Sequence, residues 1–519
     1  MSKNSRTKNS IINIITGFGG ELLSTILHFV VRTVFIYTLG KAYLGINGLF
    51  TNILAMLSLT ELGIGSAIAF RLYKPLAERD EKRVRMLLKF YKLAYRVIGG
   101  VIFLLGISLI PALPLLIKDY DRLEGLGINA VFLFLLFLMQ SVSSYLFLAY
   151  RSTVVTADQK NYVLDVVNYF VKIVTCIIQI VILIAFQSFI AYTMVAVFTA
   201  IGNSLMKGIV AKKKYPGFFI PENDSLSKAE IKEMFQDCGA LFIFKVNGVV
   251  LKACDNFVLS AFIGLTSVGL YSNYLLLYRT FVGLISRIFG AFKASMGNLF
   301  AVETMEVRYR FFRIVNLTAA ILFGTAGVGV AVCGNEVIET WLGADYLLAQ
   351  PVPILIGIEL LFSGIAVNLG QVRSVCGLFR QSWYRPLLGI IVNIVASITL
   401  VQIWDVSGVI LGTIISYVTT NFLIEPALIH KYAFHHYKSV ADYYVTNVGY
   451  MLVCVVVAVI DTFVCSRFFV GYGWFSVAVH VILTGASVPA VFAVLFWRTE
   501  EFQYLFGTAR KVLMKVRGR

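Results

Sequence analysis

The sequence has 519 residues, of which 58% are hydrophobic and only 14% are charged, and its formal net charge is +17. At a mean hydropathy of +0.81 a soluble chain could not cover its surface with polar groups, so the composition excludes a string of soluble domains and predicts a membrane protein. The basic excess is a feature of membrane topology, as the loops below indicate, so nucleic acid is not an expected partner.

Apolar segments long enough to cross a bilayer, roughly 20 residues each, follow one another along the whole chain. The sequence predicts about fourteen such spans and therefore an all-α polytopic fold. In chain order the predicted spans are 11–39, 44–70, 90–117, 128–156, 162–186, 189–211, 238–262, 268–298, 311–334, 351–377, 386–404, 407–430, 444–466 and 474–497.

The charges of the connecting loops predict the orientation of these spans. Loops that follow even-numbered spans are basic, whereas most loops after odd-numbered spans are short and neutral or acidic. The basic loop residues include Arg71, Lys74, Arg79, Lys82, Arg83, Arg85, Lys212, Lys213, Lys214, Arg308, Arg310, Arg380, Arg385, Lys431 and Lys438. The alternation predicts a multi-pass protein with both termini in the cytoplasm. That the membrane is a bacterial plasma membrane is implied only by the family resemblance given below.

An internal repeat divides the chain. A shift of 224 residues places Gly40 on Gly264 and Gly45 on Gly269, at the first and seventh inter-span connections. An even number of spans per copy predicts two parallel six-helix lobes related by an axis along the membrane normal. The predicted organisation is an N-lobe at 1–211, a cytoplasmic linker at 212–237, a C-lobe at 238–435, and two further spans with a basic tail at 436–519.

Ionisable residues recur at helical spacing within several spans. In the first span Glu21, Thr25, His28 and Arg32 follow one another at steps of four, three and four, which places them on one face. Because a charge in a span is costly unless it faces a partner or water, these stripes predict a shared hydrated cavity. The basic residues that we expect to bind the cargo are Arg32, Lys172, Lys245, Lys252, Arg279 and Arg287.

The excess of basic residues predicts an anionic cargo, since Arg in particular binds phosphate through two parallel hydrogen bonds. Intramembrane carboxylates are typical of coupling sites for protons or sodium ions. The candidates for that role are Glu21, Glu61, Asp165, Asp255 and Glu359. An H⁺ gradient, a Na⁺ gradient and the membrane potential all stay open as energy sources.

Other charged residues have simpler explanations. Arg373, Lys293 and Arg151 are interpreted as lying at the cytoplasmic rim with their head groups extended to water. For Asp255 two interpretations stay open, coupling and neutralisation of Lys252 three residues earlier.

Sequence motifs of catalysis do not point to an enzyme. The sequence has no P-loop, no HEXXH and no paired CxxC spacing, so neither ATP hydrolysis nor a metal centre is expected. No resident cofactor is expected.

Two stretches carry a family resemblance. The first runs from Arg32 through TVFIYTLGKAYLGINGLF and continues in LTELGIGSAIAFRLYKPLAERD from Leu59. The second is DNFVLSAFIGLTSVGLYSNY from Asp255. They resemble the corresponding parts of Wzx-type polysaccharide or O-antigen flippases, members of the multidrug/oligosaccharidyl-lipid/polysaccharide (MOP) exporter superfamily, and Arg32 matches the basic residue before the first glycine motif.

The resemblance implies a V-shaped arrangement of two six-helix lobes, with two C-terminal helices beside it, working by alternating access. It implies that the cargo is an undecaprenyl-pyrophosphate-linked oligosaccharide, flipped from the cytoplasmic to the outer leaflet by a monomer. Membrane lipids, a polysaccharide polymerase and glycosyltransferases are the other partners that it implies.

Two alternatives keep the fold and change the cargo. One is a cation-coupled multidrug antiporter, against which the excess of intramembrane Arg and Lys argues. The other is a lipid II flippase.

Overall fold

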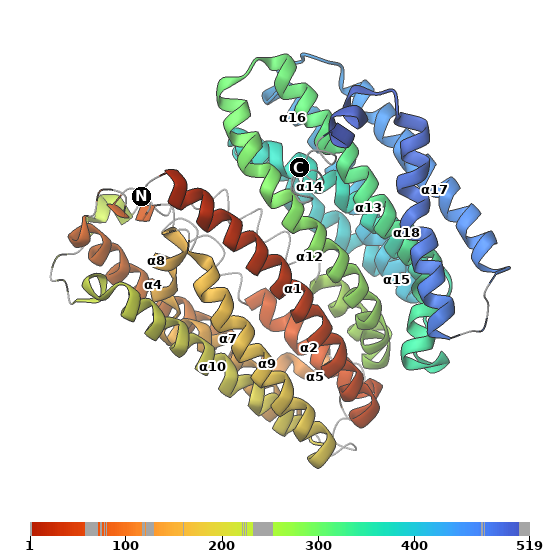
Figure 1. Cartoon of the computed structure of the whole chain (residues 1–519). Coiled ribbons are helices and arrows are strands. Elements are labelled where there is room, and N and C mark those ends of the chain that lie inside the picture. The colour runs from red at the N-terminus through yellow and green to blue at the C-terminus, as the bar shows by residue number, and fades with distance from the viewer. Residues whose placement is uncertain are drawn as a thin grey trace. The chain divides into compact units, whose positions relative to one another are not determined.

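The described part of the chain is helical and contains no β-strand (Figure 1). The computed structural model describes residues 3–57, 71–72, 75–76, 78, 80–116, 120, 129–158, 160–220, 222, 224, 226–231, 253–468, 471 and 473–507. These residues divide into two compact units, Met1–Gly269 and Leu270–Arg519. The prediction of an all-α polytopic fold is confirmed.

The first unit consists mainly of long helices. Its elements are α1 (Lys3–Leu39), α2 (Lys41–Leu57), α4 (Glu81–Ser108), η2 (Ile110–Ala112), α5 (Leu113–Leu116), α7 (Ala130–Leu146), η3 (Leu148–Arg151), α8 (Ser152–Ala157), α9 (Asn161–Phe186), α10 (Phe189–Lys214) and η4 (Pro216–Phe219). Residues 253–262 are also helical. Polar side chains begin three of these helices by accepting a backbone N–H: Asp80 before α4, Asn129 before α7 and Ser188 before α10.

The second unit consists mainly of long helices as well and includes α17 and α18. Its elements are α12 (Leu265–Val302, which begins in the first unit), α13 (Met305–Leu342), η5 (Ala344–Tyr346), α14 (Pro351–Cys376), α15 (Tyr384–Tyr417), the π-helical η6 (Val418–Ile424), α16 (Glu425–Tyr432), α17 (Val440–Cys465) and α18 (Trp474–Phe496). Residues Trp404 and Asp405 interrupt α15 with non-helical backbone angles. The predicted boundary between the eleventh and twelfth spans, at 404–407, is therefore confirmed.

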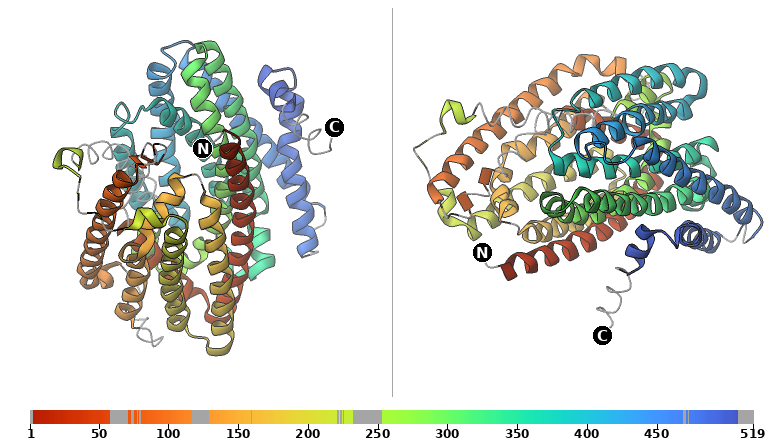
Figure 2. Two further views of the ribbon diagram at one scale, coloured as in Figure 1. Left: turned by 60° about the vertical axis from the view of Figure 1, so that its left-hand side comes forward. Right: turned by 90° about the horizontal axis from the view of Figure 1, so that it is seen from above.

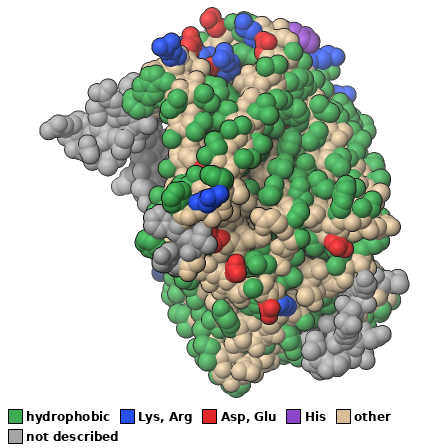
Figure 3. Space-filling model, turned by 90° about the vertical axis from the view of Figure 1, so that its right-hand side faces the viewer, with side chains coloured by type: hydrophobic (Ala, Val, Ile, Leu, Met, Phe, Trp, Pro, Cys, Tyr) green, Lys and Arg blue, Asp and Glu red, His purple; other side chains and the backbone are tan. Residues whose placement is uncertain are grey.

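Nine helices in the described residues are long and apolar enough to cross a membrane. The second and seventh predicted spans include residues 58–70 and 238–252, which lie outside the described ranges, so the total of fourteen stays a prediction. On the face drawn in Figure 3, hydrophobic side chains are spread over the whole surface, and most of the charged side chains lie toward one end. Such a surface is suited to lipid, and the chain is a multi-pass membrane protein.

Glycines of the sequence repeat shape both helix connections. Gly40 after α1 and Gly264 before α12 have φ of +87° and +127°, a region that favours glycine. A Cβ on Gly45 would lie 2.1 Å from the carbonyl oxygen of Leu265, and one on Gly269 would lie 2.7 Å from that of Lys41. The two copies of the repeat thus contact each other within the first unit, and only glycine permits this approach.

Close helix packing also organises the second unit. In α13 and α14, a Cβ on Gly327 would lie 2.7 Å from the carbonyl oxygen of Gly357, and one on Gly357 would lie 2.5 Å from that of Gly327. Small residues allow such backbone contact between membrane helices. On another face of α13, α17 and α18 pack through a buried apolar cluster of Leu317, Val328, Cys454, Val457, Val488 and Phe492.

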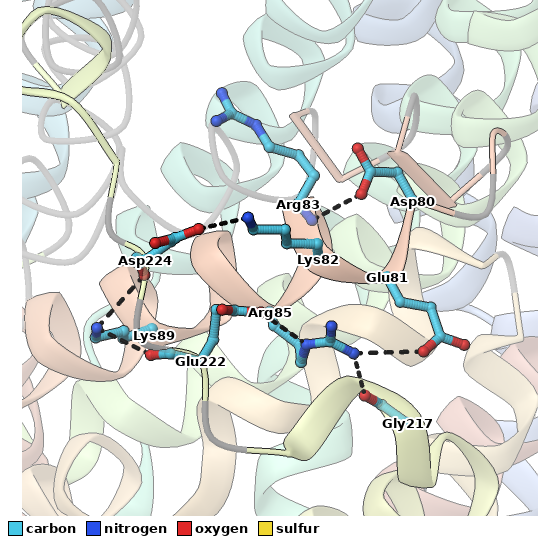
Figure 4. Close-up of polar contacts among 9 residues, drawn as sticks. All are labelled: Asp80, Glu81, Lys82, Arg83, Arg85, Lys89, Gly217, Glu222 and Asp224. Carbon is cyan, nitrogen blue, oxygen red and sulfur yellow. Dashed lines mark hydrogen bonds and ion pairs between the residues drawn. The ribbon is translucent and has the colours of Figure 1, made fainter.

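The segment after α10 is held against the start of α4 by charged side chains (Figure 4). Arg83 contacts Glu230, Lys82 contacts Asp224 at 2.5 Å, and Arg85 contacts Glu222 at 3.0 Å. Lys89 adds bonds of 3.0 and 3.4 Å to the carbonyl oxygens of Glu222 and Asp224. We call these contacts the linker clamp.

Candidate functional site: a cationic cluster on α1 and α9

Helices α1 and α9 lie side by side in the first unit (Figures 1 and 2), and small residues of α1 let them approach closely. Gly20 is buried, and a Cβ there would lie 1.8 Å from the ring of Tyr169 on α9. The Tyr169 hydroxyl donates to the carbonyl oxygen of Gly17 at 3.4 Å. This approach brings the polar stripes of the two helices together.

Lys172 of α9 crosses to the α1 stripe. Its ammonium donates to the hydroxyl of Ser24, and its Nζ lies 3.1 Å from Nδ1 of His28. An ammonium has only donors, so Nδ1 of His28 must accept and the ring is neutral. The neutral imidazole then carries its proton on Nε2, a further donor, and His28 is exposed.

Arg32 and Glu21 complete the cluster. Both interact electrostatically with His28, and Glu21 also interacts with Lys172. The cluster therefore holds two basic side chains and one carboxylate, a local excess of basic groups. All three charged side chains are half-buried rather than sealed from solvent. The structure brings together Arg32, Lys172 and Glu21, three of the residues predicted from sequence.

A second polar contact lies between α9 and α10. Asp165 interacts with Lys207, and Asn203 donates to the side-chain oxygen of Asn168 at 3.0 Å. Lys207 was not among the predicted site residues, although its position inside an apolar stretch was a signal for it. Asp165 thus has a basic neighbour on α10.

The other predicted residues are more dispersed. Arg279 and Arg287 are exposed on α12, whereas Asp255 and Glu359 are buried, with 6% and 5% of their surface exposed. Glu359 interacts with Tyr278, whose hydroxyl lies 2.7 Å from that of Ser363. Three predicted residues, Glu61, Lys245 and Lys252, lie outside the described part of the chain.

Arg373 differs from its predicted environment. Instead of extending to water at the rim, its side chain is 14% exposed and contacts the carboxylate of Glu425. Arg385 binds the other oxygen of Glu425 at 3.1 Å and also contacts Asn421. One buried carboxylate thus serves two guanidinium groups at the meeting of α14, α15 and α16. Sequence reasoning missed this cluster because Glu425 is 52 residues from Arg373.

Within the described residues, no group of three or more His, Cys, Asp or Glu side chains could hold a metal ion.

Comparisons with known proteins identify the fold. No family model matches the sequence, and no curated protein is significantly similar to it. Among solved structures, the lipid II flippase MurJ in an inward closed conformation is 15% identical, with 93% of this chain and 98% of that chain covered and a TM-score of 0.66. An inward-facing multidrug resistance MATE family transporter of the MOP superfamily is 12% identical, with coverages of 80% and 96% and a TM-score of 0.60. A MATE transporter of Vibrio cholerae is 12% identical, with coverages of 83% and 99% and a TM-score of 0.58.

The chain therefore has the fold of the MATE transporters and of MurJ. These structural neighbours are transporters and a flippase.

Proposed function

We propose that this chain is a flippase that translocates an undecaprenyl-pyrophosphate-linked oligosaccharide from the cytoplasmic to the outer leaflet by alternating access. The observation that carries the proposal is the cationic cluster of Arg32, Lys172 and His28. The fold supports a transporter or flippase, and more of the chain aligns with the lipid II flippase than with the MATE transporter, 93% against 80%.

The chemistry of the cluster suits a pyrophosphate. Arg32 offers a planar fork of donors for two phosphate oxygens, and Lys172 offers a compact charge already oriented by Ser24. Glu21 offsets only part of this charge. We propose that Arg279 and Arg287 of α12 also bind the anionic cargo, together with Lys245 and Lys252.

A flipping assay tests the proposal. Purified protein in liposomes is given fluorescent undecaprenyl-pyrophosphate oligosaccharide, and arrival of the sugar in the opposite leaflet is measured. We expect transport of this lipid and little transport of the matching undecaprenyl monophosphate sugar, which has fewer phosphate oxygens for Arg32 and Lys172. Equal transport of both lipids, or of neither, would contradict the assignment.

The buried carboxylates favour a second candidate, a cation-coupled multidrug antiporter. Glu359, which interacts with Tyr278, and Asp255 are both buried within helices. Binding of a proton or a sodium ion to either carboxylate would therefore change the charge inside the helices. The same liposomes distinguish the candidates. Gradient-driven uptake of organic cations, with no flipping of the anionic lipid, would favour the antiporter. Flipping of lipid II alone would favour the third alternative, a lipid II flippase.

A further inference from the structure

Three consecutive lysines, Lys212, Lys213 and Lys214, form the last turn of α10, and all three are exposed. Cations are favourable at this end of a helix because the carbonyl dipoles point toward them. Immediately after the turn come Tyr215 and the apolar segment η4, followed by Ile220, which is 57% exposed. The basic residues therefore adjoin an apolar surface.

These lysines differ from the basic residues of α4 in what neutralises them. In the linker clamp Lys82, Arg83 and Arg85 each contact a carboxylate. None of the ion pairs formed among the described residues involves the three lysines of α10. The nearby Asp158 is already engaged by Lys160 and by the Tyr215 hydroxyl. The end of α10 thus keeps its positive charge.

Aromatic rings lie close to these basic residues. The Lys214 ammonium lies 5.4 Å from the centre of the Tyr162 ring, and Tyr215 and Phe218 stack at 5.7 Å with an interplanar angle of 8°. The Arg151 guanidinium lies 5.3 Å from the centre of the Phe219 ring. Aromatic rings of this kind are enriched at the level of lipid headgroups, where lysines can reach phosphate.

We propose that Lys212, Lys213 and Lys214, with the rings of Tyr162 and Tyr215, form a binding surface for anionic phospholipid headgroups. We call it the α10 patch. The charge is on the protein and has no ion-pair partner within the described part of the chain, the rings position it at headgroup depth, and a leaflet rich in anionic lipid supplies the opposite charge. Bound headgroups would fix the end of α10, from which the segment held by the linker clamp departs.

Native mass spectrometry of the delipidated full chain tests this surface without any cargo. Phosphatidylglycerol and phosphatidylcholine are titrated separately against the wild type and against the triple variant Lys212→Gln, Lys213→Gln, Lys214→Gln. We expect the wild type to prefer phosphatidylglycerol, and its apparent Kd to rise about fivefold for each lysine removed. A matched triple variant, Lys82→Gln, Arg310→Gln, Arg313→Gln, should change the affinity less than about twofold, because these three residues already contact Asp224, Glu500 and Glu501.

Equal affinity for the two lipids in the wild type, or an equal loss of affinity in the two triple variants, would overturn the proposal. Displacement of the lipid by millimolar inorganic phosphate would also overturn it, since it would indicate a site for free phosphate. If the triple variant does not fold, the single variant Lys213→Gln carries the test, with an expected change of about fivefold. Because no cargo is present, failure of the flippase proposal would leave this result intact.

Discussion

Two clusters place a pair of basic residues inside apolar helices, and they differ in how the charge is balanced. In the second unit Arg373 and Arg385 share Glu425, and the three side chains are 14%, 5% and 2% exposed. In the first unit Lys172 contacts a hydroxyl and a neutral imidazole, and it interacts electrostatically with the carboxylate of Glu21. The second-unit cluster is buried, whereas the side chains of the first-unit cluster are half-buried or exposed.

The difference separates two uses of intramembrane cations. A carboxylate shared by two buried guanidinium groups leaves little room for an external anion and ties three helices together. A cation oriented by neutral partners keeps its attraction for an anion that arrives later. The first arrangement is therefore expected to determine stability, and the second to determine transport.

Loss of Glu425 is the most severe test of this comparison. In the variant Glu425→Gln, both Arg373 and Arg385 lose their shared counter-charge while remaining buried. We expect the free energy of unfolding to fall by about 3–5 kcal/mol, the usual cost of breaking a buried ion pair from one side. Equilibrium unfolding in detergent micelles measures it.

The exposed pair Arg310 and Glu500 provides the control, because its side chains are 55% and 73% exposed. Glu500→Gln should change the stability by less than about 1 kcal/mol. A similar loss of unfolding free energy in Glu425→Gln and Glu500→Gln would mean that the buried Glu425 cluster contributes no more to stability than an exposed ion pair.

Changes in the α1–α9 cluster should act on transport instead. We expect Arg32→Ala and Lys172→Met each to reduce the initial flipping rate by about 10- to 100-fold, the range for lost hydrogen bonds to a charged group. The melting temperature should stay close to that of the wild type. As a control, Arg467→Ala removes a cation of the second unit, whose guanidinium lies over the Phe463 ring.

Full transport by both cluster variants would contradict the site. If a loss of stability accounts for the lost transport, the α1–α9 cluster must stabilise the fold, as the Glu425 cluster is expected to do.

Helical spacing is what made the first cluster predictable. Residues Glu21, His28 and Arg32 share a face of one uninterrupted helix, so the sequence alone places them together. Which face of α9 meets them depends on the contact between Gly20 and Tyr169, a tertiary detail that spacing does not contain. The Arg373 partner is also tertiary, since Glu425 follows a hairpin and a π-helix.

The repeat shows the same division. The match of Gly40 with Gly264 is visible in sequence, and their shared positive φ follows from what glycine allows. The mutual contact of Gly45 and Gly269 is a consequence of how the chain folds back and had no local signal.

Gly45→Ala separates packing from charge in the first unit. Its Cβ would meet the Leu265 carbonyl oxygen at 2.1 Å, a backbone atom with little freedom to move. We expect a loss of about 1–3 kcal/mol in the free energy of unfolding, as for other overpacked sites. In the same helix, a Cβ on Gly48 would lie 3.5 Å from a methyl group of Val268, an ordinary contact, so Gly48→Ala is the matched control.

If the stability of Gly45→Ala is unchanged, the backbone at the contact between Gly45 and Leu265 must be able to move apart at little cost in free energy. The charge clusters would then be the principal constraints on these helices.

The linker clamp is a third arrangement, in which the cations are paired with carboxylates and are half-buried or exposed. The smallest of the predicted effects is expected here. A hydrogen bond from Arg83 lowers the pKa of Glu230 from 4.5 to about 2. In the same way, a hydrogen bond from Arg85 lowers the pKa of Glu222, and one from Lys82 lowers the pKa of Asp224. A carboxylate with a lowered pKa stabilises the folded contact above its ordinary pKa and loses that contribution as the pH falls. The clamp should therefore be intact at neutral pH and weaken between about pH 4.5 and pH 2.

A fluorophore on Lys228→Cys, an exposed linker position, reports the clamp by its anisotropy. We expect the anisotropy to be high at pH 7, to fall as the pH decreases from 4.5 toward 2, and to fall at pH 7 in molar salt, since exposed ion pairs are screened. Glu230→Gln should lower it at neutral pH without abolishing it, because Glu222 and Asp224 still have their partners. If neither acid nor salt changes the anisotropy, the linker must be held by the hydrogen bonds from Lys89 to backbone carbonyl oxygens instead, because these bonds involve no carboxylate.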